Sequence, residues 1–429
     1  MATLRLGVLS LFCAAAVVAV PATASAPQAP AAPFQSQVLA LYDAYEAQLA
    51  IVRAGGWTRV PDTETLRPGM RAPAVIALRH RLAASGDAAA VPQPETLALQ
   101  DYDEALAAAV AGFQRRHGLE ADAVVGPATL RALNVSAPTR LRQLALNLER
   151  WQRLPIDDSG SMILVNVPEF RAQLFRNGNP DLSLRAVVGA RKTPTPDLAE
   201  PLDRIVLNPS WFVPARIGRR ELLPKVIADP GYLARNNYRA YADGEALPAS
   251  AFAEPESLPE ARSLRFRQEP GPQNALGRVK FVLPNERGIF LHDTASRDLF
   301  ERSRRAFSHG CVRLETPLAL VRTLLENEAG WSAQRVQSQL ERSKTIHLKL
   351  AAPLPVYVQY LTARVIDGEV HYFDDIYRRD TERLANRSFE REWVSLLAAL
   401  RKDRRQRERG DLLAERARKV LPPTVAAAL

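Results

Sequence analysis

The sequence predicts an α+β fold, in which a β-rich domain of sandwich or barrel-like form carries a helical insertion and follows a set of helices. Two observations predict it. Up to Leu154, apolar residues recur at steps of three and four, the spacing of one helix face. After Pro155 the chain changes to short β-branched segments bounded by Gly, Pro and Asn, which is typical of strands in a sandwich or barrel.

The first 26 residues have the pattern of a signal peptide. Arg5 precedes an apolar run from Leu6 to Val20, and Ala24-Ser25-Ala26 gives the small residues of a signal-peptidase site. The run is about fifteen residues, short of the roughly 20 that span a bilayer. We therefore expect residues 1–26 to export the protein to the periplasm. The alternative is an uncleaved membrane anchor at this N-terminus.

The net charge of the chain indicates which class of partner it binds. The sequence has 57 Lys and Arg residues against 47 Asp and Glu residues, a formal charge of +10. For an exported protein this excess favours anionic cell-wall polymers or lipid headgroups over nucleic acid. Part of it lies in residues 401–409, RKDRRQRER, within a basic helical tail predicted over residues 379–429. We interpret that run as a solvated helix face.

Two segments are predicted to form a helical scaffold, residues 27–66 and 135–156. Within them, Phe34–Arg53 and Arg140–Leu154 each place apolar residues on one face, so we expect the two helices to pack together. Gly55-Gly56 ends the first helix.

Residues 67–134 are predicted to form a small all-α module of three helices. Its later part holds a set of motif residues, which are Phe113-Gln114, Gly118-Leu119, Asp122, Val125-Gly126-Pro127, Thr129 and Leu133. With these residues the module resembles the peptidoglycan-binding-domain-1 family. Ala123 departs from that family's usual glycine. The resemblance implies a peptidoglycan-binding fold, and whether the module binds glycan or serves only as structure stays open.

The β-rich domain is predicted over residues 157–378. Residues 214–269 break the strand pattern into helical pieces and loops, which we interpret as an insertion that forms a lid. Thr316-Pro317 begins a further helix. The expected strands are 162–167, 172–175, 184–188, 204–207, 279–283, 289–292, 345–350 and 356–360.

One cysteine stands out because removal of the signal peptide would take away the only other one, Cys13. Lipoprotein processing at Cys13 is disfavoured by the bulky Phe12 before it. The remaining Cys311 lies in the stretch SHGCVR among polar residues and glycine, rather than in an apolar pattern. An odd cysteine in an exported protein is a candidate reactive thiol.

The surroundings of Cys311 contain the groups that a thiol nucleophile needs. His292 ends a predicted strand and can reach a loop cysteine as a base. Gly310 leaves room for backbone N–H groups to face an oxyanion. Arg313 adds a positive charge for a substrate carboxylate. The N-terminus of the helix at Pro317 is expected to favour the thiolate of Cys311.

The other histidines are interpreted as structural or solvated, with two of them on the surface of the helical module. They are His80, His117, His347 and His371. An alternative for the cysteine region is a zinc site of His292, His309 and Cys311, but no fourth ligand at good spacing is present. We therefore expect no metal and no cofactor.

His292-Asp293-Thr294 followed by Ser308-His309-Gly310-Cys311-Val312-Arg313 resembles the signature of the L,D-transpeptidase family, which has the YkuD-type catalytic domain. The resemblance extends over roughly residues 34–380, to the large periplasmic members with a substrate-capping insertion. It implies a fold with that catalytic domain, peptidoglycan stem peptides and glycan as partners, and acylation by carbapenems.

The resemblance also implies roles for single residues. Cys311 is the nucleophile and His292 the proton acceptor and donor, oriented by the backbone at Asp293. His309 shapes the site, while Gly310 and Cys311 supply the oxyanion hole and Arg313 supports the loop or a stem carboxylate. The expected reaction is transfer of a tetrapeptide acyl group to another stem. A D-amino acid, water or a lipoprotein lysine stay open as acceptors, and a non-catalytic wall-binding protein remains the rival.

Overall fold

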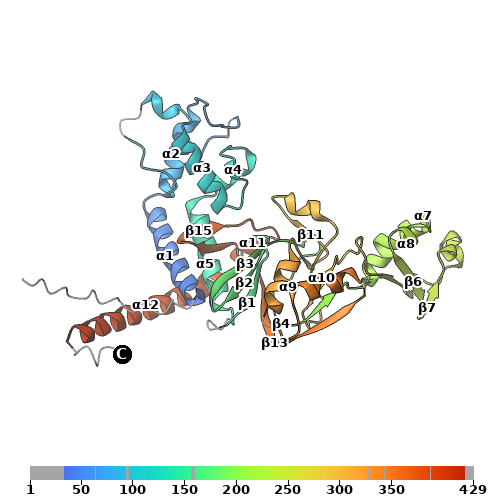
Figure 1. The fold of residues 1–429 in the computed structure, drawn as a ribbon. Helices are drawn as coiled ribbons and strands as arrows, with labels where there is room; N and C mark the ends of the chain where they lie inside the picture. Colours follow the sequence, from blue (N-terminus) through green and yellow to red (C-terminus); the bar gives the residue numbers. More distant parts are fainter. Residues whose placement is uncertain are drawn as a thin grey trace, which may run out of the picture. The chain divides into compact units, whose positions relative to one another are not determined.

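The computed structural model describes residues 33–420, except for residues 63, 93–95, 156–159, 327, 343 and 387. The predicted signal peptide, residues 1–26, lies outside the described residues. Within the described part of the chain, no helix is long and apolar enough to cross a membrane. Figure 1 shows the order of the elements along the chain.

The β-rich domain contains one sheet of nine strands, in the order β11-β3-β12-β10-β9-β4-β13-β1-β2. Strand β2 also pairs with β3, so eight strands form a closed ring and β11 adds an edge. The predicted barrel-like form is therefore confirmed. The strands are β1 (Met162–Asn166), β2 (Arg171–Arg176), β3 (Asn179–Gly189), β4 (Leu198–Leu207), β9 (Val279–Val282), β10 (Leu291–His292), β11 (Ala306–Ser308), β12 (Val312–Leu314) and β13 (Ile346–Gln359).

The strands predicted at 345–350 and 356–360 are one strand, β13, with a register shift between Lys349 and Leu354 where it pairs with β4. Pro353 and Pro355 lie in and next to this irregular stretch, which is why the sequence pattern breaks there. Two helices, α9 (Pro317–Leu325) and α10 (Ala333–Glu341), contribute leucines and valines to the same hydrophobic core as the sheet. The sequence predicted α9 but not α10.

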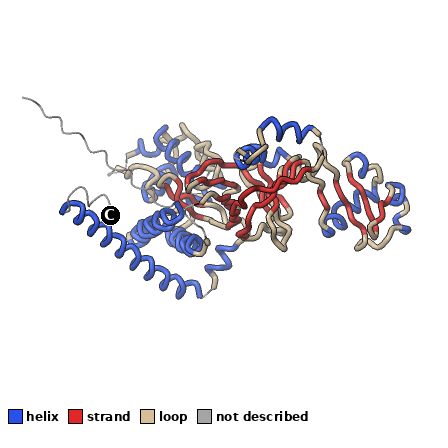
Figure 2. The backbone as a smooth tube through the Cα atoms, turned by 60° about the horizontal axis from the view of Figure 1, so that its bottom comes forward, coloured by secondary structure: helices blue, strands red, loops and turns tan. Residues whose placement is uncertain are grey.

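The sequence analysis expected helical pieces and loops in the insertion, but the structure also contains strands there. The insertion holds a four-stranded antiparallel sheet with a hydrophobic core of its own around the buried Phe252 and Phe266. Its strands were missed because their strand signal is weak: in Tyr238–Ala242, for example, the buried positions are two alanines, a residue type that is depleted in strands. The elements are β5 (Trp211–Phe212), α6 (Ala215–Ile217), η2 (Gly218–Leu222), α7 (Leu223–Ala228), α8 (Tyr232–Arg235), β6 (Tyr238–Ala242), β7 (Glu245–Leu247), η3 (Ala249–Ala253), η4 (Pro255–Ser257) and β8 (Leu264–Gln268). Figure 2 draws the strands of both sheets in red.

The two predicted scaffold helices, α1 (Pro33–Arg53) and α5 (Ala137–Gln152), pack side by side (Figure 1). They share a hydrophobic cluster with one side of β1 and with an unpredicted hairpin, β14 (Ala363–Ile366) and β15 (Glu369–Tyr372). The tail forms α11 (Arg379–Leu384) and the long α12 (Ser388–Val420). Arg401 of α12 pairs with Glu46 of α1 at 3.1 Å, so part of the basic run is engaged with a helix rather than only with solvent.

The helical module contains α2 (Ala74–Ala84), η1 (Leu97–Gln100), α3 (Glu104–Arg116) and α4 (Pro127–Leu133) around one apolar cluster. The amide of buried Gln114 donates to Asp122 and Thr129 and accepts from the Ala123 N–H, which holds the loop before α4. Ala123 has a φ of 59°, the left-handed region that glycine adopts without strain.

His117 is not on the module surface as expected. It is buried, and its ring stacks on Phe113 and on Tyr372 of β15, so it joins the module to the hairpin. Burial lowers the pKa of His117 well below its usual value, and the nearby Arg140 adds to the effect. The ring is therefore neutral at physiological pH, in agreement with its interpretation as a structural residue.

Candidate active site

Three neighbouring strands place a row of polar side chains on one face of the sheet. In the register of β9, β10 and β12, Lys280 is opposite His292, and His292 is opposite Arg313. Side chains alternate between the two faces of a strand, so the residues one position away lie on the other face. These are Phe281, Leu291 and Val312, all fully buried in the core. The alternation thus separates an apolar core face from a polar face with a histidine at its centre.

The ring of His292 is held by the chain itself. Its Nδ1 lies 2.5 Å from the carbonyl oxygen of Asp293, and a carbonyl only accepts, so Nδ1 carries the proton and Nε2 has the free lone pair. Burial lowers the pKa of His292 to about 3, helped by the positive charges of Arg313 and Lys280. His292 is therefore a neutral imidazole at physiological pH, with Nε2 able to accept a proton.

Asp293 acts through its backbone at this site. Its carboxylate accepts a hydrogen bond from the Arg278 N–H at 2.7 Å and pairs with Arg297 at 2.7 Å. The carboxylate is buried and does not line the cavity described below. The carboxylate of Asp293 thus holds the turn before β9, while its backbone carbonyl orients His292.

Cys311 precedes β12, and its side chain lies toward the same cavity as His292. Its thiol donates to the Gly288 carbonyl, with Sγ 3.6 Å from the oxygen. Burial raises the pKa of the Cys311 thiol, although the Phe290 N–H, Lys280 and Arg313 each oppose that shift. The resting residue is thus a thiol rather than the thiolate we expected from α9, and its activation requires a base.

The loop before Cys311 is held by the buried Ser308. The hydroxyl of Ser308 accepts from the Gly310 N–H at 3.1 Å and donates to the Cys311 carbonyl at 2.5 Å. Gly310 has a φ of +119°, which disfavours a side chain there. The Gly310 N–H, expected to face an oxyanion, is therefore engaged inside the loop in this conformation.

Behind the same loop lies Thr195, fully buried and not singled out by the sequence analysis. Its hydroxyl donates to the Gly310 carbonyl at 2.8 Å and accepts from the Gly189 N–H at 2.8 Å. The hydroxyl of Tyr377 accepts from the Thr195 N–H at 3.2 Å and donates to the Gly189 carbonyl at 2.6 Å. The residue before Cys311 is thus held by a buried polar network.

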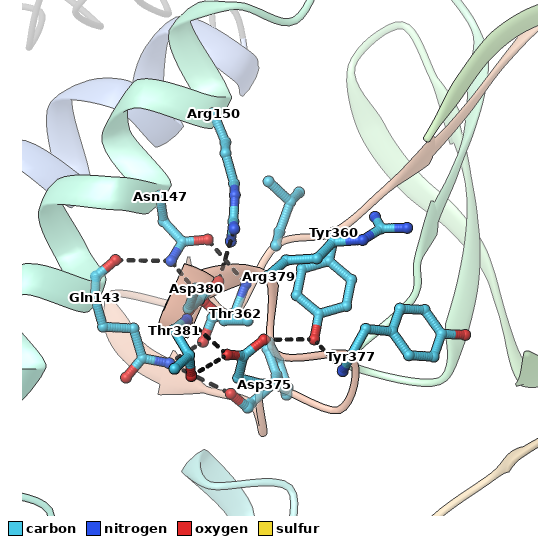
Figure 3. Close-up of polar contacts among 12 residues, drawn as sticks. Gln143, Asn147, Arg150, Tyr360, Thr362, Asp375, Tyr377, Arg379, Asp380 and Thr381 are labelled. Atoms are coloured by element: carbon cyan, nitrogen blue, oxygen red, sulfur yellow. Dashed lines mark hydrogen bonds and ion pairs between the residues drawn. The ribbon is translucent and has the colours of Figure 1, made fainter. Parts of the chain in front are cut away.

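Figure 3 shows how this network continues toward α5. Tyr360 accepts from the Tyr377 N–H and donates to Asp375, both at 2.8 Å. Asp375 in turn accepts from Thr381 at 3.0 Å. The adjacent Asp380 pairs with Arg150 of α5 at 2.7 Å. A chain of hydrogen bonds, continued through the adjacent residues Thr381 and Asp380, therefore connects the helical scaffold with the loop that carries the thiol.

The polar face opens into a cavity of about 800 Å³ that the insertion closes on one side. Cys311, His292, His309 and Arg313 line it together with residues from β5 to β6. The lining residues from this side include Trp211, Phe212, Arg216, Arg220, Tyr232 and Tyr238. His309 Nε2 lies 2.7 Å from a carboxylate oxygen of Glu221 in η2, so the catalytic-loop histidine contacts the insertion directly.

Comparison with known proteins identifies the domain that contains this site. Residues 160–337 match the family model described as "L,D-transpeptidase catalytic domain", and residues 71–133 match "Putative peptidoglycan binding domain". Over residues 160–337 the β-rich part of this chain is thus similar to L,D-transpeptidase catalytic domains. Both matches lie within the domains predicted from the sequence, 157–378 and 67–134.

Individual relatives carry the same family name. The chain is 35% identical over 259 residues to a Haemophilus influenzae protein named "Putative L,D-transpeptidase", a match that covers 59% of this chain and 52% of the relative. The chain thus spans about half the length of the curated relative it matches. Solved L,D-transpeptidases from Xylanimonas cellulosilytica and Stackebrandtia nassauensis are 15% and 12% identical, each over 70% of this chain and 99% and 97% of theirs, with TM-scores of 0.20 and 0.26.

The zinc alternative finds no support in the geometry of the β-rich domain. His309 Nε2 contacts Glu221 in the insertion, and His292 Nδ1 is engaged by the Asp293 carbonyl. Among the described residues, no three His, Cys, Asp or Glu side chains gather closely enough to hold a metal ion.

The sequence analysis missed Lys280, Thr195, Tyr377 and the cations of the insertion. Lys280 could have been found from its position: it alternates with Val279 and Phe281 in a short strand and therefore lies on the polar face. Thr195 and Tyr377 carry no local signal, because Thr195 contacts Gly310 at a separation of 115 residues and Tyr377 contacts Thr195 at a separation of 182 residues.

Proposed function

We propose that this protein is a peptidoglycan L,D-transpeptidase that forms cross-links through a thioester on Cys311. The observation that carries the proposal is the pairing of a protonated Cys311 thiol with a neutral His292 whose Nε2 is free, in one cavity of the L,D-transpeptidase domain. Such a pair can move one proton in each direction during acyl transfer.

In the first half-reaction, His292 Nε2 takes the thiol proton as Sγ attacks the carbonyl carbon between diaminopimelate and the terminal D-alanine of a tetrapeptide. The C–N bond breaks, and the leaving amine of D-alanine takes the proton from Nε2. A thioester remains on Cys311. Because the Gly310 N–H is engaged with Ser308, the Cys311 N–H is the nearer candidate to stabilise the oxyanion.

In the second half-reaction, an amine of another stem attacks the thioester carbon. Its proton passes to His292 Nε2 and then to the departing sulfur, which restores the thiol. Arg313 adjoins His292 in the row of polar residues and supports the substrate's negative charge, while His309 holds the insertion through Glu221. No resident metal or cofactor enters either step.

The proposed setting is the periplasm, with peptidoglycan stem peptides and glycan as partners and no nucleic acid. The match of residues 71–133 to a peptidoglycan-binding model supports a wall substrate. The basic composition of the chain supports an anionic polymer as partner.

The test is a digest of purified tetrapeptide-rich muropeptides, with products identified by mass spectrometry. A dimer lacking one D-alanine, absent with Cys311→Ala, is the expected result. Cys311→Ser should abolish dimer formation, and His292→Ala should lower its rate by about 10²- to 10⁴-fold, the usual contribution of a positioned base. Dimer formation by Cys311→Ala would refute the proposal.

Other products would identify the alternatives. Tripeptide alone would indicate an L,D-carboxypeptidase that transfers the acyl group to water. No muropeptide product, together with acyl transfer to a lipoprotein lysine, would indicate an anchoring enzyme. Sacculus binding that survives Cys311→Ala without any product would indicate a non-catalytic wall-binding protein.

A further inference from the structure

The cavity of the proposed transpeptidase is lined by many cations and a single carboxylate. The insertion contributes Arg216, Arg220 and Lys225. The barrel domain contributes Lys192, Lys280, Arg287 and Arg313. The one carboxylate is that of Glu221, and it already contacts His309. The ratio of cations to carboxylates in this cavity, seven to one, is therefore far higher than the ratio of 57 to 47 in the chain as a whole.

Outside the cavity, several arginines of the insertion pair with carboxylates, whereas, among the described residues, Arg219 and Arg265 contact only backbone carbonyls. Away from the cavity, Arg235 pairs with Asp229, and both Arg239 and Arg267 pair with Glu269. Within the described part of the chain, Arg216 and Arg220 have no carboxylate within ion-pair distance, and neither have the other cavity cations. The Nε of Arg313 is buried without a hydrogen-bond partner.

Unpaired cations that converge on a cavity indicate an anionic ligand, because a bound carboxylate supplies the charge-assisted hydrogen bonds that the protein leaves unmade. Lys280 and Arg313 flank His292, close to the reacting bond. Arg216 and Arg220 lie on α6 and η2 and line the same cavity. A ligand in this cavity thus meets cations from both the barrel domain and the insertion.

We propose that Arg216 and Arg220 of the insertion bind free carboxylates of the donor peptide away from the reacting bond, so that the enzyme selects stems whose side-chain carboxylates are not amidated. This inference rests on the transpeptidase proposal above. Diaminopimelate is a dicarboxylic acid, and only one of its carboxyl groups takes part in the bond that breaks. The second one is the carboxylate we assign to these arginines.

The first experiment measures binding without chemistry. The full chain with Cys311→Ala is titrated by calorimetry with two synthetic tetrapeptides, which differ only in whether the second carboxyl group of diaminopimelate is free or amidated. We expect amidation to weaken binding about tenfold, the size of one charge-assisted hydrogen bond. Adding Arg216→Gln and Arg220→Gln should bring the ratio of the two dissociation constants close to one.

Arg219→Gln is the matched control. Arg219 lies in the same turn, is exposed and does not line the cavity, and its guanidinium donates to the Ala215 carbonyl. Arg219→Gln removes the same charge outside the cavity, so the ratio of the two dissociation constants should stay at its original value. Equal affinity of the Cys311→Ala protein for both peptides, or an equal loss of selectivity with Arg219→Gln, would overturn the inference. So would the absence of binding by either peptide at millimolar concentration.

A second measurement separates this inference from the proposed function. The chain with Cys311 intact is incubated with each peptide and the dimers are quantified. Equal dimer formation from both peptides would refute the selectivity and leave the transpeptidase proposal standing. No reaction with either peptide would refute the transpeptidase proposal, and the inference with it. Preferential dimer formation from the free carboxylate, lost with Arg216→Gln and Arg220→Gln, would support both.

Discussion

Thr195 offers the sharpest test of how the fold positions the nucleophile. Replacement by valine keeps the shape of the side chain and removes only its hydroxyl. Two buried backbone groups then lose their partner, the Gly189 N–H and the Gly310 carbonyl. Each such group costs about 1–3 kcal/mol when left unsatisfied, so we expect Thr195→Val to lower the free energy of unfolding by roughly 2–6 kcal/mol.

The same substitution should slow acylation. Gly310 directly precedes Cys311, and a misplacement of about 1 Å at a reacting group costs on the order of 10²-fold in rate. Thr195→Ser is the matched control because it keeps the hydroxyl and loses one buried methyl group, worth about 1 kcal/mol. It should retain most of the acylation rate.

Urea unfolding followed by tryptophan fluorescence measures the stability, and carbapenem acylation followed by intact mass measures the rate. The rate is taken well below the start of the unfolding transition, so that it reports the folded enzyme. A Thr195→Val protein within about 0.5 kcal/mol and twofold of the original would refute this reasoning. Equal defects in the valine and serine variants would show that the methyl group, and not the hydroxyl, matters.

Three further predictions concern backbone strain and protonation. Ala123→Gly should raise the free energy of unfolding by up to about 1 kcal/mol in chemical denaturation, because Ala123 adopts a φ of 59°. Gly277→Ala should destabilise the fold by several kcal/mol and abolish acylation, because the added Cβ would lie 2.3 Å from the Asp293 carboxyl carbon. Gly368→Ala is the control: it has open space around it and should cost only about 1–2 kcal/mol. The folded-state pKa of His292, about 3 against 6.5 unfolded, means that the folded state binds fewer protons below pH 6.5. The free energy of unfolding should therefore fall as pH drops from about 6.5 to 3, and a series of urea unfolding curves should show a flatter dependence for His292→Gln.

Several features of this protein follow from local sequence. The alternation in the segments around Lys280, His292 and Arg313 is sufficient to divide a core face from a polar face, because successive strand residues point to opposite sides. The helices of the scaffold and module were likewise predictable, since their apolar spacing is a property of each segment alone. The motif around Cys311 and His292 indicates the chemistry through residue type and spacing alone.

Other features were beyond the sequence because they depend on distant contacts. The strands of the insertion are stabilised by a small core assembled from several segments. A strand such as Tyr238–Ala242, whose buried positions are alanines, does not reveal that core. His117 has the sequence context of a helix end, yet β15 covers it.

By itself the sequence determined the β-rich domain, the helical module and the pair of His292 and Cys311, because periodicity and the motif are local. Only the tertiary structure decided the protonation of that pair. Burial keeps the thiol protonated and the imidazole neutral, and burial depends on the whole fold. The tertiary structure also decided that Thr195 holds the loop and that arginines of the insertion line the same cavity as the thiol. Such contacts join segments that are far apart in the chain, and the local sequence of neither segment indicates the contact.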